Sequence, residues 1–393
     1  MPPFDADLQQ RLAALREQGL YRELRKVDSA QGPRIEINGR KYLNFSSNDY
    51  LGLANHASLK EASIKCIEKY GAGAGASRLI CGSQAPLHEL EEALASFKKV
   101  DAALTFSTGY AAAVGTITAL AGKDDIIILD KLVHASIVDA ARLSGAKLRV
   151  FAHNDLNDLE EKLKWAKENA PQSGRTLVIT ESIFSMDGDA APLREIVTLK
   201  EKYGAWLMID EAHATGVLGN QGRGLADKLG VSPQIEIQMG TLGKAVGASG
   251  GFICGSRSLI NYLVNRARSF IFSTAPVPAA AAAANAGIQI IQAAEGEERR
   301  VRLWKNLENF KAGTPDFRAE ISSAILPLIL GEETKAVSAA AKLKEQGIFV
   351  PAIRYPTVAR NAARLRITLT AAHTPNDIAT LTNALKSTLD PLS

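Results

Sequence analysis

An acidic residue and a lysine with small neighbours are the first candidates for chemistry in this chain. Asp210 ends an apolar run and is followed three positions later by His213. Lys244 follows another apolar run and stands between Gly243 and Ala245. Small neighbours let a flat ligand approach the backbone, and removal from water lowers the pKa of an amine toward nucleophilic competence. The pattern predicts a buried, reactive lysine beside a carboxylate.

A further candidate is a group of hydroxyls and a glycine at the start of a helix. Ser107, Thr108, Gly109 and Tyr110 follow an apolar run and precede the alanine-rich stretch 111–120. Hydroxyls and backbone N–H groups at a helix N-terminus form a cup for phosphate. A Schiff-base lysine, a carboxylate that keeps a pyridine nitrogen protonated and a phosphate cup are together what pyridoxal phosphate requires.

Three local motifs indicate other chemistries, and each lacks a part. The stretch 71–76 has the dinucleotide-loop spacing G-x-G-x-x-A but follows a helical pattern, not a strand. The stretch 247–251 matches G-x-S-x-G, so a serine hydrolase at Ser249 with Asp210 and His213 is a distant alternative, although a strand pattern follows where a helix is needed. The tetrapeptide ending at His213 spells a helicase box, but no P-loop accompanies it, and no second histidine nearby has metal-ligand spacing. No metal site is expected.

Short apolar runs of strand length alternate with amphipathic stretches through the middle of the chain. The runs are 103–106, 126–129, 148–151, 177–180, 206–209, 235–239 and 252–254. Strands that alternate with helices predict an α/β fold with a mainly parallel seven-stranded sheet covered on both faces. Ligands bind beyond the carboxyl ends of the strands in such a sheet, which is where the candidate residues stand.

The two ends of the chain have different patterns. Leu8, Leu12 and Leu15 lie on one helical stripe, and a turn at Asn38-Gly39 predicts a hairpin. A long helix is expected at 279–304, followed by two strands and two helices. We expect an N-terminal helix and hairpin segment at 1–50, a large cofactor-binding α/β domain at 51–290 and a small α+β C-terminal domain at 291–393.

Composition excludes several classes of protein and partner. The chain has 393 residues, 46% hydrophobic and 22% charged, which is typical of a globular protein too long for one core. The net charge of +4 indicates no nucleic-acid partner. The three cysteines are scattered singly, and the acidic residues near the N-terminus and the shortness of the apolar runs lead us to expect neither a signal peptide nor a membrane-spanning segment. A cytoplasmic location without a membrane partner is expected.

Several motifs resemble those of the α-oxoamine synthases, pyridoxal-phosphate enzymes with the aspartate-aminotransferase fold (fold type I). The resemblance covers nearly the whole chain. Its motifs are the stretches 42–52, 184–189, 210–216, 241–244, 354–358 and 364–368. The stretches 354–358 and 152–155 resemble the biotin-pathway branch of the family more than its glycine-using members.

The resemblance implies a reaction and its partners. The biotin-pathway branch condenses L-alanine with pimeloyl-CoA, or with a pimeloyl acyl carrier protein, and releases carbon dioxide and the thiol. The alternative within the family is a ligase that joins glycine to acetyl-CoA. The resemblance further implies pyridoxal 5′-phosphate as cofactor and a homodimer with a shared active site.

The resemblance also implies a role for each matching residue. Lys244 would bind the cofactor covalently and serve as catalytic base, with His134 as the second catalytic residue. The implied cofactor contacts are Gly109, Tyr110, His134, Ser185, Asp210, His213, Thr241, Lys244 and, from the other subunit, Thr274. The implied substrate contacts are Arg22, Asn48, His134, Arg354, Thr357 and Arg366. The residues alone leave alternatives open: His134 as a helix cap, and Arg354 and Arg366 as structural ion-pair partners.

Overall fold

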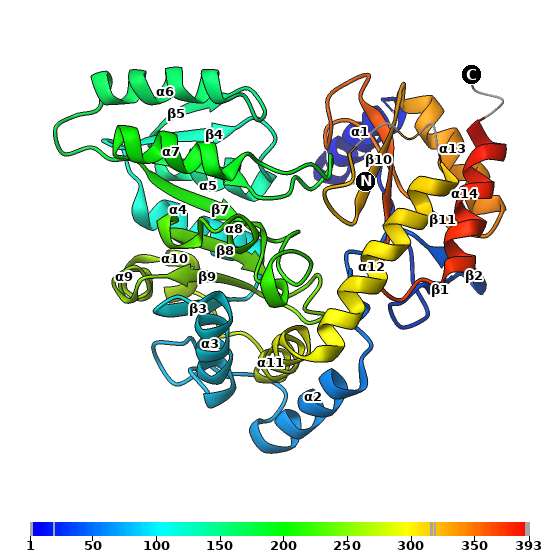
Figure 1. The fold of residues 1–393 in the computed structure, drawn as a ribbon, viewed down its shortest axis with the longest axis horizontal. Helices are drawn as coiled ribbons and strands as arrows, with labels where there is room; N and C mark the ends of the chain where they lie inside the picture. The colour runs from blue at the N-terminus through cyan, green and yellow to red at the C-terminus, as the bar shows by residue number, and fades with distance from the viewer. Residues whose placement is uncertain (1–2, 19, 315–316, 318–319, 390–393) are drawn as a thin grey trace.

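The centre of the molecule is a sheet whose strands run in the order β3-β9-β8-β7-β6-β4-β5 (Figure 1). The structure, a computed structural model, describes residues 3–18, 20–314, 317 and 320–389. The strands are β3 (Ala102–Phe106), β4 (Ile126–Asp130), β5 (Lys147–Phe151), β6 (Thr176–Glu181), β7 (Trp206–Asp210), β8 (Ile237–Thr241) and β9 (Gly251–Gly255). Only β9 runs antiparallel to its neighbours within this sheet. The predicted mainly parallel sheet of seven strands is therefore confirmed.

Helices cover both faces of the sheet, which explains why its strands read as continuous apolar runs. One face packs against α4 (Gly109–Leu120), α5 (Ala135–Ser144), α9 (Arg257–Arg266) and α10 (Arg268–Ile271). The other packs against α3 (Ala85–Lys98), α6 (Leu156–Asn169), α7 (Leu193–Tyr203), α8 (Leu225–Leu229) and α11 (Pro278–Gln292), with α2 (Ala57–Tyr70) against α11. Ile127 and Leu129 of β4 enter the first core, and Ile126 and Ile128 enter the second.

Six strands end at the same edge of the sheet. The carboxyl-terminal residues Phe106, Asp130, Phe151, Glu181, Asp210 and Thr241 lie there because β3, β4, β5, β6, β7 and β8 run in the same direction. The polar segments that follow these residues are consequently brought together.

A second lobe lies beside the sheet domain and combines both ends of the chain (Figure 1). One sheet contains β10 (Ile325–Gly331), β13 (Ala363–Thr368) and β12 (Ala352–Ile353), and another contains β1 (Arg34–Ile37), β2 (Arg40–Asn44) and β11 (Ile348–Phe349). The helices of this second lobe are α12 (Ala294–Gly313), α13 (Glu333–Glu345) and α14 (Pro375–Leu389). Two 3-10 turns, η1 (Asn220–Gly222) and η2 (Ser232–Gln234), belong to the sheet domain. Asn38 and Gly39 have positive φ angles of 51° and 73°, which a two-residue hairpin of the predicted kind requires.

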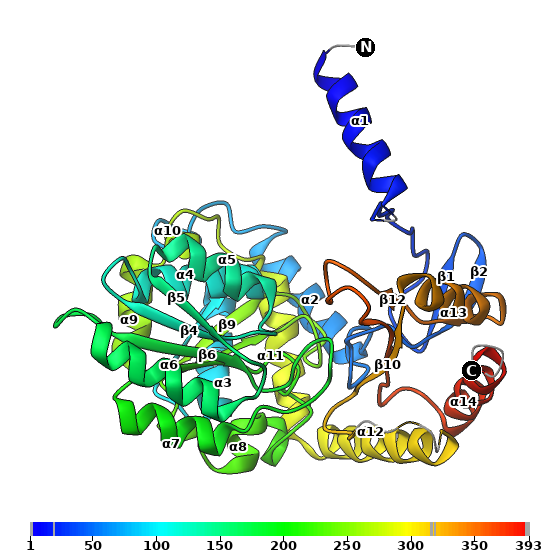
Figure 2. The same cartoon turned by 90° about the horizontal axis from the view of Figure 1, so that it is seen from above.

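The prediction of one continuous helix over 279–304 is wrong. The helix breaks at Ala293, and α12 leaves α11 to run along the second lobe (Figure 2). The break leaves carbonyl groups at the end of α11 without helical partners. Arg300 donates to one of them, Ile291 O, at 2.9 Å, and Gly296 N donates to Ala293 O at 3.0 Å.

The predicted N-terminal helix is present as α1 (Pro3–Glu17), and it projects away from both lobes (Figure 2). None of its residues is buried, so the leucine stripe has no core to pack against within the described chain.

The predicted division at 50 and 290 remains a proposal. The hairpin of residues 34–44 pairs with β11, so the first segment and the C-terminal segment share one sheet. Among the described residues, no helix combines the length and apolar character needed to cross a membrane.

Candidate active site

Lys244 lies in the turn that joins β8 to β9, at the carboxyl edge of the sheet. The turn is closed by hydrogen bonds from Leu242 N to Gly250 O and from Gly247 N to Lys244 O. Gly247 has a φ of +77°, and a Cβ there would lie 2.6 Å from the carbonyl carbon of Leu53, so glycine is required. Burial lowers the pKa of the Lys244 amine to about 8, although nearby carboxylates oppose this shift. About a tenth of the amine is therefore unprotonated at pH 7, far more than for an ordinary lysine.

Two buried carboxyl groups come from neighbouring strands. Glu181 of β6 and Asp210 of β7 are register partners in a parallel pair, so their side chains lie side by side on one face. Burial raises the pKa of both groups, and the charge of Lys244 opposes that shift in each. Asp210 Oδ1 accepts a hydrogen bond from Ala212 N at 2.8 Å. The pair creates a site in which a nearby cation is favoured.

Glu181 is among the polar residues expected at this sheet edge, but no role was predicted for it. Its Oε2 accepts a hydrogen bond from Ser185 N at 3.2 Å, whereas its Oε1 has no partner among the described residues. A buried carboxyl oxygen without a partner is costly unless a ligand supplies one. The available signal was its place directly after an apolar run, which it shares with Asp210.

His213 connects Lys244 to Tyr50, another residue without a predicted role. His213 Nε2 is 2.6 Å from Lys244 Nζ, and its Nδ1 is 2.5 Å from the Tyr50 hydroxyl. Burial and the surrounding cations hold the pKa of His213 well below its usual value. The ring is therefore neutral at physiological pH. Nothing in the sequence separates Tyr50 from an ordinary core aromatic residue.

His134 both caps a helix and approaches the site. Its Nδ1 accepts a hydrogen bond from Ser136 N at 3.2 Å, so it is the N-cap of α5. Burial lowers the pKa of His134, while the Asp210 carboxylate opposes this shift. Because Nδ1 is an acceptor, the neutral ring carries its proton on Nε2. The capping alternative is correct and leaves an Nε2–H donor free for chemistry.

Arg366 is a buried cation surrounded by neutral acceptors. Its Nε donates to Ser185 O at 2.7 Å, its two terminal nitrogens each lie 3.2 Å from Asn48 Oδ1, and NH1 lies 3.1 Å from Thr368 Oγ1. No ion pair joins Arg366 to an acidic residue within the described chain. The structural ion-pair alternative for Arg366 therefore finds no partner. Such an arginine favours an anionic ligand.

The predicted phosphate cup lies next to the Lys244 turn. Thr108 is the N-cap of α4 and accepts from Ala111 N at 3.0 Å. A Cβ on Gly109 would lie 3.9 Å from the Cβ of Thr241, so these two predicted residues are neighbours. A Cβ on Gly251 would lie 2.6 Å from the Gly109 backbone, which explains the glycine at 251.

Tyr110 and Thr274 lie outside the buried cluster. The hydroxyl of Tyr110 donates to Asp139 Oδ2 at 2.9 Å, and its ring is half exposed. Thr274 is exposed, forms a bridge with Ser77, and lines a small cavity together with Ser107.

The three remaining predicted substrate contacts come from the second lobe and from the segment that leads into it. Arg22 is exposed in the segment between α1 and β1. Arg354 and Thr357 share a turn in which Thr357 N donates to Arg354 O at 3.0 Å. Thr357 is exposed and Arg354 is partly buried. The roles of these three residues remain predictions.

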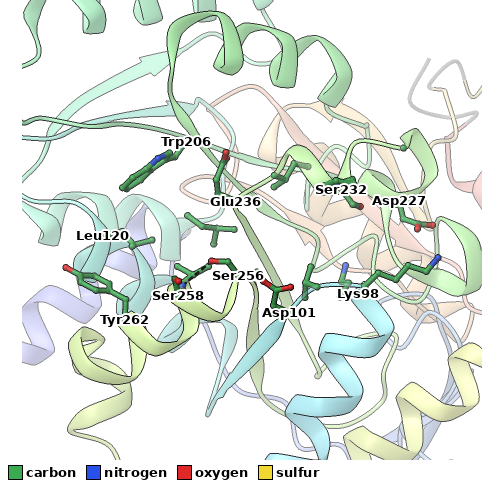
Figure 3. A pocket seen from close by; sticks show the side chains of 18 residues that line it. Lys98, Asp101, Leu120, Trp206, Asp227, Ser232, Glu236, Ser256, Ser258 and Tyr262 are labelled. Atoms are coloured by element: carbon green, nitrogen blue, oxygen red, sulfur yellow. Dashed lines mark hydrogen bonds between the residues drawn. The ribbon is translucent and has the colours of Figure 1, made fainter.

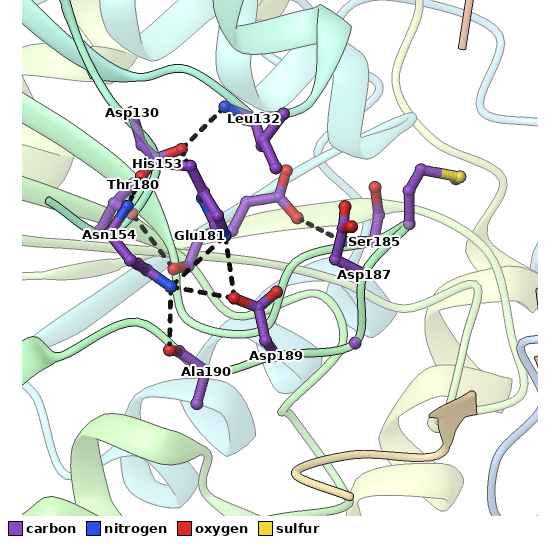
Figure 4. Close-up of polar contacts among 12 residues, drawn as sticks. Asp130, Leu132, His153, Asn154, Thr180, Glu181, Ser185, Asp187, Asp189 and Ala190 are labelled. Atoms are coloured by element: carbon purple, nitrogen blue, oxygen red, sulfur yellow. Dashed lines mark hydrogen bonds and ion pairs between the residues drawn. The ribbon is translucent and has the colours of Figure 1, made fainter. Parts of the chain in front are cut away.

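A polar network holds the loop that follows β6 (Figure 4). His153 lies between two carboxylates, 3.0 Å from Asp130 and 2.8 Å from Asp189, and packs edge-on against Phe184. Burial opposes the charged ring, but hydrogen bonds to the two carboxylates raise the pKa of His153 to about 10. A protonated His153 therefore ties the loop to β4.

The same loop contacts the second lobe. Arg364 forms an ion pair of 2.6 Å with Asp187, and Ser323 Oγ donates to Gly188 O at 2.8 Å. Together with the hydrogen bond from Arg366 to the Ser185 carbonyl, these contacts hold β13 near the loop and so fix Arg366 opposite the sheet edge. The site is thus assembled between the two lobes.

The arrangement required of a serine hydrolase is absent at Ser249 in the described structure. Ser249 is exposed and is followed by strand β9, not by a helix. Both ring nitrogens of His213 are engaged by Tyr50 and Lys244.

A separate cavity of about 840 Å³ lies at the opposite end of the sheet (Figure 3). Its lining includes Trp206 and Ile237, the first residues of β7 and β8, and Gly255, the last residue of β9. None of the predicted site residues lines it. The amino ends of parallel strands are not where this type of sheet binds its main ligand.

Comparisons with known proteins agree with this geometry. Residues 40–385 match the family described as aminotransferase class I and II. A curated relative from Thermoanaerobacter pseudethanolicus, named 8-amino-7-oxononanoate synthase, is 46% identical over 94% of this chain and 93% of its own length.

Two solved structures share the fold over most of the chain. A serine palmitoyltransferase from S. paucimobilis, in a structure with bound PLP, has a TM-score of 0.91 and 30% identity over 98% of this chain and 97% of its own. An 8-amino-7-oxononanoate synthase from Francisella tularensis has a TM-score of 0.75 and 29% identity over 90% of this chain and 99% of its own.

Proposed function

This chain belongs to the aminotransferase class I and II family, and we propose that it catalyses the 8-amino-7-oxononanoate synthase reaction of biotin biosynthesis. In this reaction a C–C bond forms between the Cα of L-alanine and the carbonyl carbon of a pimeloyl thioester. The C–S bond breaks to release the thiol, and the bond from Cα to the alanine carboxylate breaks to release carbon dioxide. The observation that carries the reaction type is the buried Lys244 beside two carboxyl groups and an arginine without an acidic partner.

Pyridoxal 5′-phosphate is the cofactor, and the groups of the site fit it. Asp210 is a buried carboxyl group suited to a protonated pyridine nitrogen, and the unpartnered Glu181 Oε1 shows that polar capacity remains in the site. When bound, the cofactor supplies a carbonyl carbon that condenses with amines and a ring that accepts an electron pair from Cα. The residues proposed to hold it are Gly109, Tyr110, His134, Ser185, Asp210, His213, Thr241, Lys244 and, from the other subunit, Thr274.

Arg366 is proposed to bind the carboxylate of the amino acid. Its guanidinium faces only neutral acceptors and is held in place by Asn48 and the Ser185 carbonyl. A carboxylate placed there would neutralise the buried charge through charge-assisted hydrogen bonds. Arg22, Arg354 and Thr357 are proposed for the acyl side.

Lys244 is proposed to remove and return the Cα proton. Its pKa of about 8 lets the amine accept a proton at Nζ and release it again near neutral pH. His134 is proposed to donate a hydrogen bond from Nε2 to charge that develops on the substrate, because its Nδ1 is occupied by the cap.

A homodimer is part of the proposal. Thr274 is exposed, and its bridge partner Ser77 precedes two exposed apolar residues, Leu79 (50% exposed) and Ile80 (79% exposed). Phe272, near Thr274 in the chain, is 70% exposed. An apolar surface of this kind supports a face that a second chain covers. The proposal covers delivery of the acyl group either by CoA or by a carrier protein. It also includes a cytoplasmic location, which the three free thiols of the chain support.

The proposal is tested by competition between substrates. The purified protein is given L-alanine or glycine together with pimeloyl-CoA or acetyl-CoA, and thiol release and the ketone product are measured. The expected result is the highest kcat/KM with L-alanine and pimeloyl-CoA, with 8-amino-7-oxononanoate as product. Preference for glycine and acetyl-CoA would reassign the chain to the 2-amino-3-ketobutyrate ligase branch. A parallel assay with L-alanine and pimeloyl carrier protein identifies the donor by comparison of its kcat/KM with that for pimeloyl-CoA.

A further inference from the structure

Five side chains form one line of hydrogen bonds from Lys244 to Arg366, and the three between the ends are His213, Tyr50 and Asn48. Lys244 Nζ is 2.6 Å from His213 Nε2, and His213 Nδ1 is 2.5 Å from the Tyr50 hydroxyl. The hydroxyl donates to Asn48 Oδ1 at 3.2 Å, and that oxygen also accepts from both terminal nitrogens of Arg366. Tyr50 is completely buried and His213 is 5% exposed. Water therefore does not replace these partners.

The direction of each hydrogen bond follows from the two ends of the line. A protonated Lys244 has three donors and no acceptor, so His213 Nε2 must be the acceptor. A neutral imidazole then carries its proton on Nδ1 and donates to the Tyr50 oxygen. Asn48 Oδ1 can only accept, and it receives the Tyr50 proton. The line has a single consistent assignment while Lys244 is charged.

We propose that Tyr50 is a positioning residue that sets the tautomer of His213, and thereby makes His213 an acceptor that stabilises the protonated form of Lys244. Only a hydroxyl at this place accepts from Nδ1 while donating to Asn48. Removal of the hydroxyl would leave a buried N–H without a partner, which is costly. The proton then favours Nε2, where it opposes the ammonium group of Lys244.

Most of the other charged groups around the line act independently of Tyr50. Asp210 of β7 and Glu181 of β6 favour the charged lysine, and Arg366 of β13 opposes it. His134, which precedes α5, and Arg366 disfavour a charge on His213. Asp210, Glu181 and His134 form no hydrogen bond with the Tyr50 hydroxyl, whereas Arg366 interacts with it and is also held by Asn48 and Ser185 O. Tyr50→Phe therefore acts mainly through the tautomer of His213, and the direct reading of that tautomer below separates it from an effect of Arg366.

The test uses the cofactor-free protein without substrate, so its outcome is separable from that of the proposed reaction. The pKa of Lys244 is measured from the pH dependence of trace acetylation, followed by mass mapping of the peptide that contains Lys244. Tyr50→Phe is expected to lower this pKa by about one unit, because a hydrogen bond to a charged group is lost. Tyr203→Phe is the matched control, since it removes a hydroxyl that bonds Glu160 far from the site.

A second measurement reads the tautomer directly. ¹⁵N NMR of labelled histidine, with His213 assigned by a His213→Gln variant, is expected to show Nδ1–H in the wild-type protein at pH 7 and a shift toward Nε2–H in Tyr50→Phe. The inference is overturned if wild-type His213 carries its proton on Nε2 at pH 7, which needs no variant to fold. It is equally overturned if Tyr50→Phe folds and leaves the Lys244 pKa unchanged.

Discussion

At the residue scale, the site is organised by charges that are buried without complete compensation. Asp210 and Glu181 place two carboxyl groups side by side, and burial raises the pKa of each. Lys244 and Arg366 supply the positive charges, and Arg366 has no acidic partner in the described chain. The carboxylate of an amino acid would supply the anion that Arg366 lacks.

The role of Arg366 can be tested by a substitution that keeps the charge. Arg366→Lys preserves the cation but loses the fork that bonds Ser185 O and Asn48 Oδ1 together. We expect the KM for L-alanine to rise about 10- to 100-fold, from the loss of about 1.5–3 kcal/mol of charge-assisted hydrogen bonding. Steady-state kinetics at saturating acyl donor measure this. An unchanged KM for the amino acid, with a changed KM for the thioester, would place Arg366 on the acyl side.

The reactivity of Lys244 predicts a pH dependence. Only the unprotonated amine attacks a carbonyl carbon, and burial lowers the pKa of Lys244 to about 8. The rate at which cofactor-free protein takes up pyridoxal phosphate should therefore rise with pH, reach half its maximum near pH 8 and then level off. Stopped-flow absorbance follows the uptake. A rate that continues to rise beyond pH 10 would indicate an ordinary, unshifted lysine.

At the element scale, two loops carry the chemistry, and each is constrained by packing. The loop after β6 is tied to β4 through His153 and to β13 through Arg364 and Asp187. The turn after β8 depends on Gly247, whose backbone lies against Leu53. Strands and packing contacts thus hold both loops in place, as a preorganised site requires.

Two glycines of the Lys244 turn provide a matched pair of variants. In Gly247→Ala the alanine must adopt a positive φ, and its Cβ would lie 2.6 Å from a backbone atom. We therefore expect the free energy of unfolding to fall by about 2 kcal/mol or more. Gly243→Ala, whose nearest neighbour would be 3.7 Å away, should change stability by less than about 0.5 kcal/mol. Denaturant unfolding measures both. Equal effects of the two substitutions would show that the turn is not fixed as described.

At the scale of the whole molecule, the active site lies where two lobes and, by proposal, two subunits meet. The sheet edge provides Lys244 and Asp210, and β13 of the second lobe provides Arg366. Thr274 is exposed and forms no hydrogen bond with the Lys244 cluster among the described contacts of its own chain.

A shared active site predicts complementation between two inactive variants. Lys244→Ala lacks the reactive amine, and Thr274→Arg would block the phosphate contact that Thr274 is proposed to make in the other subunit. After unfolding and refolding together, hybrid dimers contain one intact site and should recover activity that neither variant has alone. Sedimentation should give twice the 42.0 kDa mass of the chain. A monomeric protein, or a dimer without any complementation, contradicts the shared site.

Much of this organisation could be predicted from the sequence because it depends on local patterns. The apolar runs predicted the positions of the strands. The position of Asp210, Lys244 and the Thr108–Gly109 cup after these runs predicted that they lie at one edge of the sheet. The break at Ala293 was missed although Gly296, a poor helix former, follows it. A Cβ on Gly296 would clash with Ile291 O, so the close approach of the two helix ends depends on this glycine. Tyr50 was missed, and Glu181 was placed at the sheet edge without a role, because their roles arise from neighbours distant in the chain.

The central claim is that the reaction is built around Lys244 carrying pyridoxal phosphate, and borohydride reduction tests it most directly. The protein is loaded with the cofactor, reduced, digested and analysed by mass spectrometry, beside Lys244→Ala treated in the same way. The account predicts a yellow wild-type protein whose cofactor mass is fixed on the peptide at Lys244, and no fixation at that position in the variant. A colourless protein, fixation on another lysine, or full activity of Lys244→Ala would contradict it.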